Sequence, residues 1–171
     1  MLLSVFKTLL HRLSAQDDVI VGTPFAGRNR FETEGLIGFF INTIVMRTDF
    51  SENPNFLEVL SRARRMTLDA YAHQDVPFEM LVEELRPERD LSHNPIFQIM
   101  FAVHRLGEDV LETSGLSSSA DFASALESAE STASTTRSDL QVHVNEIGDV
   151  VAVMWNYNES LFEQTTMRRL A

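Results

Sequence analysis

Apolar residues recur at two spacings along this chain, and the change between them marks the expected helices and strands. Between residues 2 and 13 leucine and phenylalanine return at helical spacing on so many sides that this helix is expected to be buried and central. A second helix is predicted to start at Asn53-Pro54 and to continue to Tyr71, because asparagine caps helices and proline suits the first helical position. A third, shorter helix is predicted over 77–85.

The predicted strands are short and rich in β-branched and aromatic residues. "DDVIVG" (17–22) is expected to be a strand that ends at its glycine, and "IGFFINTIVMRTDF" (37–50) is apolar on both faces, which is typical of a strand inside a sheet. A further strand begins with "NPIFQIMFAV" (94–103). Residues 139–157 alternate, turn at Gly148-Asp149 and alternate again, which predicts a β-hairpin before a last amphipathic segment.

Length and composition fit one α/β domain, because 171 residues can bury a sizeable apolar core. The net charge of -11 disfavours nucleic acid as a partner, whose phosphates it would repel. The chain has no cysteine, which excludes disulfides and thiolate chemistry and permits the reducing cytoplasm, the expected location. No run of eighteen apolar residues is present, so no membrane span is expected, and the first helix is interpreted as part of the fold rather than a signal peptide.

One segment departs from the periodic pattern. Residues 112–138 hold thirteen Ser or Thr among twenty-seven, and seven acidic residues stand against one basic residue between Glu108 and Asp139. Such a composition buries too little apolar surface to offset the entropy of ordering. A flexible surface insertion is therefore expected at 112–138, with a recognition loop as the alternative.

Known catalytic motifs are absent from the sequence. It contains no nucleophile elbow, dinucleotide fingerprint, Walker loop or H-E-x-x-H pair, and its five histidines show no metal-binding spacing, so no metal is expected. His73 and Asp75, in "HQDVPFE", invite interpretation as a catalytic pair. Asp75 just ahead of Pro77 is, however, well placed to cap the following helix, and His73 to close the preceding one. No nucleophile or oxyanion donor accompanies them, which favours a structural joint.

Three ordered motifs resemble a known family. "IGFFINTIVMR" (37–47), "HQDVPFE" (73–79) and "RDLSHNPIFQIMF" (89–101) resemble the late core motifs of condensation domains in nonribosomal peptide synthetases. "QDDVIVGTPFAGRNR" (16–30) and "STTRSDLQVHV" (134–144) are similar to the same family, so the resemblance covers nearly the whole chain. It implies a chloramphenicol-acetyltransferase-like lobe, with a mixed β-sheet packed with helices, corresponding to most of the second of two lobes.

The resemblance also implies an activity and partners. Such domains join an acyl or peptidyl thioester on one peptidyl carrier protein to the amine of an aminoacyl thioester on another, forming an amide. Both substrates arrive on phosphopantetheine arms, and no cofactor is expected to bind directly. The expected partners are carrier proteins, the missing N-terminal lobe of the same domain and a neighbouring adenylation domain, with neither nucleic acid nor membrane.

The family's catalytic histidine belongs to an H-H-x-x-x-D-G motif of the first lobe, which this chain lacks. The nearest segment, from His104 to Asp109, has neither the paired histidine nor the final glycine. No catalytic residue is therefore expected here, and the motif residues are interpreted as structural. Asn42 is the candidate substrate contact, because the family's matching asparagine faces the tunnel between the lobes; an amide bonded within the sheet is the alternative. The residues interpreted as structural are His73, Asp75, Pro77, Arg89 and Asp90.

Two departures from the family pattern affect local structure. Ser138 stands where an aromatic residue usually precedes Asp-Leu, which removes an apolar anchor, and His93 stands where arginine is common. The chain resembles a piece of a longer synthetase. Two functions follow: the acceptor-side half of an amide-forming condensation domain, or a non-catalytic condensation-like module that recruits carrier proteins or partner enzymes. An intact histidine motif upstream would distinguish the first from the second.

Overall fold

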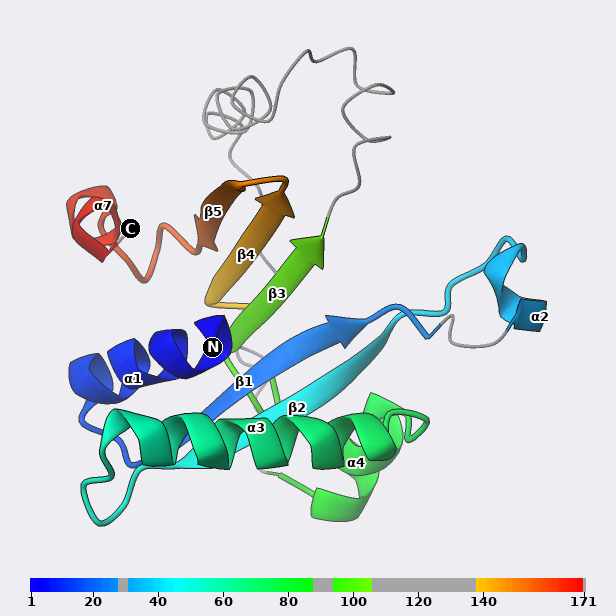
Figure 1. Ribbon diagram of the computed structural model, residues 1–171, viewed down its shortest axis with the longest axis horizontal. Helices are drawn as coiled ribbons and strands as arrows, with labels where there is room; N and C mark the ends of the chain where they lie inside the picture. Colours follow the sequence, from blue (N-terminus) through cyan, green and yellow to red (C-terminus); the bar gives the residue numbers. More distant parts are fainter. Residues whose placement is uncertain (28–30, 88–93, 106–137, 171) are drawn as a thin grey trace. The chain divides into compact units, whose positions relative to one another are not determined.

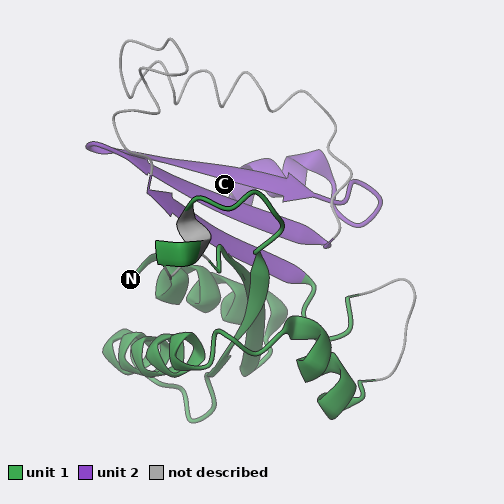
Figure 2. Ribbon diagram, turned by 90° about the vertical axis from the view of Figure 1, so that its right-hand side faces the viewer, with its two compact units in different colours: residues 1–98 green, residues 99–171 purple. Residues whose placement is uncertain are grey.

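The computed structural model of the protein describes residues 1–27, 31–87, 94–105 and 138–170 (Figure 1). The chain divides into two units, 1–98 and 99–171, which Figure 2 shows in different colours. The expected insertion at 112–138, apart from its last residue, lies outside the described residues. So do Arg89, Asp90 and His93.

The first unit is built on an antiparallel pair of strands. β1 (Asp18–Phe25) runs against β2 (Asn42–Asp49), with Asp18 opposite Asp49 and Phe25 opposite Asn42. Between them lies a single helical turn, α2 (Phe31–Glu34). The prediction that the first strand ends at Gly22 was wrong, because the pairing continues for three more residues.

β2 is buried on one face rather than on both. Ile44, Met46 and Thr48 are buried, whereas Arg47 and Asp49 alternate with them and are exposed. The prediction of a strand apolar on both faces was wrong because the apolar residues 37–41 precede the strand instead of belonging to it, and Ile37 is fully exposed.

Helices pack on this strand pair. α3 (Phe56–Ala72) lies along β2, and α1 (Leu2–Ser14) lies beside α3 and β1 (Figure 1). Val19, Phe50 and Val59 form a buried cluster between these elements, with Leu10 packed against it. A shorter helix, α4 (Phe78–Leu85), contacts β2.

The start of α3 differs from the prediction. The helix is capped by Asn55, whose Oδ1 accepts from the backbone N–H groups of Leu57 and Glu58, while the Glu58 carboxylate accepts from the Asn55 N–H. This reciprocal capping box outcompetes the predicted cap at Asn53, which has a positive φ of 51°.

α1 is less buried than its sequence predicts. The buried residues on this helix are Ser4, Phe6 and Lys7, while Val5 and Leu13 are more than half exposed. One face of the helix contacts β1 and α3, and the remaining apolar positions are not enclosed. The prediction of an all-round buried, central helix was therefore wrong.

Among its described residues, the second unit holds three strands of a mixed sheet and the helix α7 (Gln164–Leu170). β3 (Ile99–Arg105) runs parallel to β4 (Leu140–Ile147), which pairs antiparallel with β5 (Val150–Tyr157), and α7 follows. The predicted hairpin is confirmed, with Ile147 opposite Val150 around Gly148, whose φ of 53° suits glycine. β3 begins five residues later than predicted, at Ile99 instead of Asn94.

The start of β4 shows the effect of a sequence departure. Ser138 is buried, and among the described residues its hydroxyl has no hydrogen-bond partner. A position of this kind suits an apolar side chain, since an unpaired buried hydroxyl destabilises the fold. This burial agrees with the expectation that Ser138 replaces an apolar anchor.

Candidate functional site

Asn42, the first residue of β2, joins two of the sequence motifs. Its Nδ2 donates to the carbonyl oxygens of Gln74 at 2.9 Å and Val76 at 2.8 Å. Its Oδ1 accepts from the backbone N–H of Phe78 at 3.1 Å and of its neighbour Thr43 at 2.9 Å. The amide thus connects β2 with the segment between α3 and α4, more than thirty residues away along the chain.

The third motif joins the same place through aromatic packing. The ring of Phe78 lies 5.5 Å from that of Phe97, which is 2% exposed. Phe97 in turn packs on the backbone of Gly22 in β1, so closely that a Cβ added at Gly22 would overlap the ring. We call Asn42, Phe78, Phe97 and Gly22 the motif junction, because they bring the three resembling motifs together.

The histidine and aspartate of "HQDVPFE" lie near this junction without forming a pair. His73 is the C-cap residue of α3, and its Nδ1 lies 2.8 Å from the Asp69 carbonyl oxygen. Pro77 is the N-cap of α4, so the helix begins one residue later than predicted. The acceptor for the first N–H of α4 is Asn42 Oδ1, so the prediction that Asp75 caps this helix was wrong. Arg89 and Asp90 lie outside the described residues.

This arrangement predicts that Asp75→Ala leaves stability nearly unchanged, within about 0.5 kcal/mol, as expected for a surface change away from a cap. Urea unfolding monitored by circular dichroism measures it, with Asn55→Ala as the matched control. Asn55 is an observed cap and should cost about 1 kcal/mol when truncated. If Asp75→Ala lowers the free energy of unfolding as much as Asn55→Ala does, Asp75 caps α4 as the sequence predicted.

Sequence spacing did not reveal a histidine pair on the second unit. His104 of β3 and His143 of β4 have their Nε2 and Nδ1 atoms 3.2 Å apart, with stacked rings. The parallel register places Ala102 opposite His143, so His104 lies diagonally across the ladder on the same face. Burial lowers the pKa of His143, and positive charge on His104 lowers it further. Among the described residues, no cluster of three or more His, Asp or Glu side chains could hold a metal ion.

Lys7 is the only lysine of the chain and is fully buried on α1. Its Nζ donates to the Met46 carbonyl oxygen and to Thr48 Oγ1, both at 2.8 Å. Burial lowers the pKa of this amine from 10.5 to about 7, while the negative charge of Asp18 opposes the change. No sequence pattern indicated this contact, because the lysine interrupts an apolar run and its partners lie about forty residues away.

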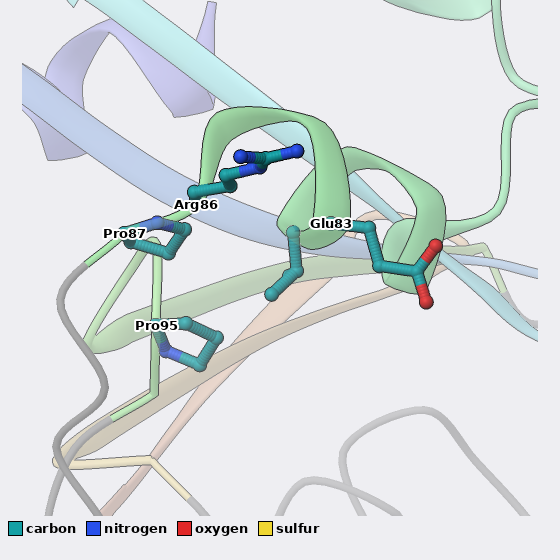
Figure 3. A pocket seen from close by; sticks show the side chains of 5 residues that line it. Glu83, Arg86, Pro87 and Pro95 are labelled. Carbon is teal, nitrogen blue, oxygen red and sulfur yellow. The ribbon is translucent and has the colours of Figure 1, made fainter.

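A hollow of about 340 Å³ lies at the C-terminal end of α4. Val82, Glu83, Arg86, Pro87 and Pro95 line it, and Figure 3 shows the charged ends of Glu83 and Arg86 pointing in different directions. The charged groups of these five residues do not converge on a common point. This hollow therefore offers shape without the clustered polar groups that chemistry requires.

No helix in the described ranges is long and apolar enough to cross a bilayer.

Comparison of the whole chain with known proteins identifies its family. A family model described as Condensation domain matches residues 1–171. One of the subunits of linear gramicidin synthase from Brevibacillus parabrevis is 47% identical over 169 residues, which are 99% of this chain and 3% of that protein. The chain therefore spans a small fraction of the curated relative that it matches.

Solved structures agree on the fold. A four-domain nonribosomal peptide synthetase bound to AMP and glycine superimposes with a TM-score of 0.78 at 22% identity, covering 98% of this chain and 13% of that one. The X-domain in complex with OxyB from teicoplanin biosynthesis gives 0.75 at 25% identity, covering 98% and 36%. These likenesses confirm the chloramphenicol-acetyltransferase-like α/β fold. With the match to the family model over its whole length, the chain belongs to the condensation-domain family of nonribosomal peptide synthetases.

Proposed function

We propose that this chain is part of a condensation domain that forms amide bonds between thioesters held on carrier proteins. The observation that carries the proposal is the 47% identity to a synthase over 99% of the chain. The substrates would arrive on phosphopantetheine arms of two peptidyl carrier proteins, with an adenylation domain as a neighbour. Family membership supports this function for the 171-residue segment, and we extend it to the whole domain of which the segment would be a part.

In the proposed reaction the amine nitrogen of the acceptor attacks the thioester carbonyl carbon of the donor. A C–N bond forms, the C–S bond breaks, and the proton lost by the amine reaches the departing thiolate. An imidazole would assist this proton transfer, and its source would be the histidine motif of the first lobe, because these 171 residues contain no such motif. The present segment would then shape and position the acceptor side.

The histidines of the described residues have other contacts. His11 Nδ1 lies 2.9 Å from the Gln16 carbonyl oxygen, His73 Nδ1 contacts a carbonyl within its own helix, and His104 pairs with His143. In the part of the chain that the structure describes, these imidazoles contact carbonyl oxygens, each other and, for His11, the Asp17 carboxylate, whose Oδ1 lies 3.7 Å from Nδ1. We therefore assign proton transfer to the first lobe.

We expect the isolated chain to form no amide above the buffer background when it is given two loaded carrier proteins. Mass spectrometry of the released phosphopantetheine arms measures the product, and a complete condensation domain from linear gramicidin synthase is the positive control. Turnover by the isolated chain that disappears in His73→Ala or His104→Ala would contradict the assignment of catalysis to another lobe.

A recruitment module is the second candidate function, and the likeness to an X-domain in complex with OxyB favours it. Sequence identity favours the first candidate over the second, because the chain is 47% identical to the synthase and 25% identical to the X-domain structure. Stable, stoichiometric binding of a partner enzyme by a whole domain that lacks condensation activity would establish recruitment instead.

A further inference from the structure

We infer that Asn42 is a positioning residue for the proposed reaction, which it affects by holding residues 74–78 against β2 rather than by touching substrate. This inference rests on the proposed function. It also replaces the expectation of a substrate contact with a different role for the same side chain.

The hydrogen bonds of the Asn42 amide are saturated within the chain. A carboxamide has two N–H donors and an oxygen with two lone pairs. In Asn42 both donors and both acceptor positions are used, at 2.8 to 3.1 Å. A substrate could bind this amide only by displacing an internal partner, which would leave a backbone group of the chain unpaired.

The groups that the amide satisfies belong to a joint between two helices. Gln74 and Val76 lie between α3, which ends at Ala72, and α4, which begins at Phe78. Their carbonyl oxygens accept from Asn42, and the Phe78 N–H is one of the donors that a helix leaves free at its start. The side chain of Asn42, which belongs to another element, thus supplies these backbone groups with the hydrogen-bond partners that helix and sheet pairing do not provide here.

Asn42 also connects two parts of the chain mechanically. It begins β2 opposite Phe25, and residues 36–41, all exposed except the half-buried Phe40, lead into the strand at this point. The amide therefore holds the start of β2 and the segment before α4 together. Phe78 then connects both to Phe97 through ring packing. Loosening the amide should shift several backbone segments at once, and shifts on the scale of about 1 Å can slow an enzyme about a hundredfold.

Two substitutions at Asn42 separate its donors from its acceptor. Asn42→Asp keeps an oxygen for the N–H groups of Thr43 and Phe78 but sets a carboxylate against two carbonyl oxygens. Asn42→Ala removes all four contacts. A third variant, Pro77→Gly, loosens the same segment while leaving the Asn42 amide intact. Asp75→Ala is the matched control, since it alters a neighbouring side chain that does not cap α4.

The first readout is amide exchange in the 171-residue chain, which does not depend on the proposed function. We expect Asn42→Ala to accelerate exchange at Phe78 and Thr43 by about tenfold or more, as expected for the loss of a hydrogen bond that restrains local opening. Asn42→Asp should accelerate it less, because an acceptor remains. Asp75→Ala should leave both amides unchanged. Unchanged exchange in Asn42→Ala would overturn the inference at its structural basis.

The second readout is a double-mutant cycle on condensation kinetics in the complete domain that contains this chain. Asn42→Ala and Pro77→Gly should each lower kcat by about tenfold with little change in KM for the aminoacyl carrier, and the double variant should be no slower than the slower single variant. Additive losses, or a raised KM with unchanged kcat in Asn42→Ala, would show a substrate contact and overturn the inference. A wild-type domain that makes no amide would defeat the proposed function, whereas the exchange result would still show whether Asn42 holds the segment.

Discussion

Replacing Phe97 with alanine should lower the free energy of unfolding by about 3 to 5 kcal/mol, the usual cost of removing a buried aromatic ring. Phe97 is 2% exposed and fills the space between the Gly22 backbone and the ring of Phe78. Because no side chain at Gly22 can move in to fill the cavity, the loss should fall toward the upper end of this range.

Urea unfolding of the 171-residue chain, followed by circular dichroism, measures this effect. Phe39→Ala is the matched control, because Phe39 is an aromatic residue of a neighbouring motif that is 88% exposed, and its truncation should change stability by less than about 0.5 kcal/mol. A loss below about 1 kcal/mol for Phe97→Ala, under the range for a buried ring, would show that the three motifs do not meet at this ring.

The second large effect is an unusual dependence of stability on pH. The pKa of Lys7 is lowered by burial from 10.5 to about 7. Between these two values the unfolded chain binds a proton that the folded chain has released, so raising the pH favours the folded state. The stability lost by burying this amine is recovered as pH rises from about 7 toward 10.5.

We therefore expect the free energy of unfolding to rise by about 2 to 3 kcal/mol between about pH 7.5 and 9.5, at about 1.4 kcal/mol per pH unit. Lys7→Met removes the amine, keeps much of its volume and should abolish this rise. As Lys7 is the only lysine in the chain, no other lysine contributes to the profile. If the free energy of unfolding changes with pH in the same way for the parent chain and for Lys7→Met over this range, the lowered pKa of Lys7 is contradicted.

Local patterns predicted the elements that depend on neighbours in sequence. The hairpin of β4 and β5 follows from strict alternation around Gly148, and α3 from its helical periodicity. The start of α3 was misplaced by two residues, since two asparagines compete for the cap and only Asn55 has Glu58 three positions on. α1 was predicted to be more buried than it is, because periodicity shows which faces are apolar without showing how many are covered.

The site depended on contacts that a linear pattern does not contain. Asn42 reaches its partners across more than thirty residues, and the role of Asp75 as a cap was wrong because this distant amide already occupies the helix start. His104 and His143 likewise become neighbours only through the parallel register of β3 and β4. The expectations for Arg89, Asp90 and the 112–138 insertion remain predictions.

The central claim is that this chain serves as the corresponding part of a working condensation domain. The most direct measurement replaces the matching segment of 169 residues in a condensation domain of linear gramicidin synthase with this chain. The hybrid is then assayed for amide formation between two carriers loaded with a panel of aminoacyl thioesters. We predict amide product that disappears when the first-lobe histidine is replaced. A hybrid that melts as cooperatively as the parent but makes no amide with any acceptor would contradict the claim.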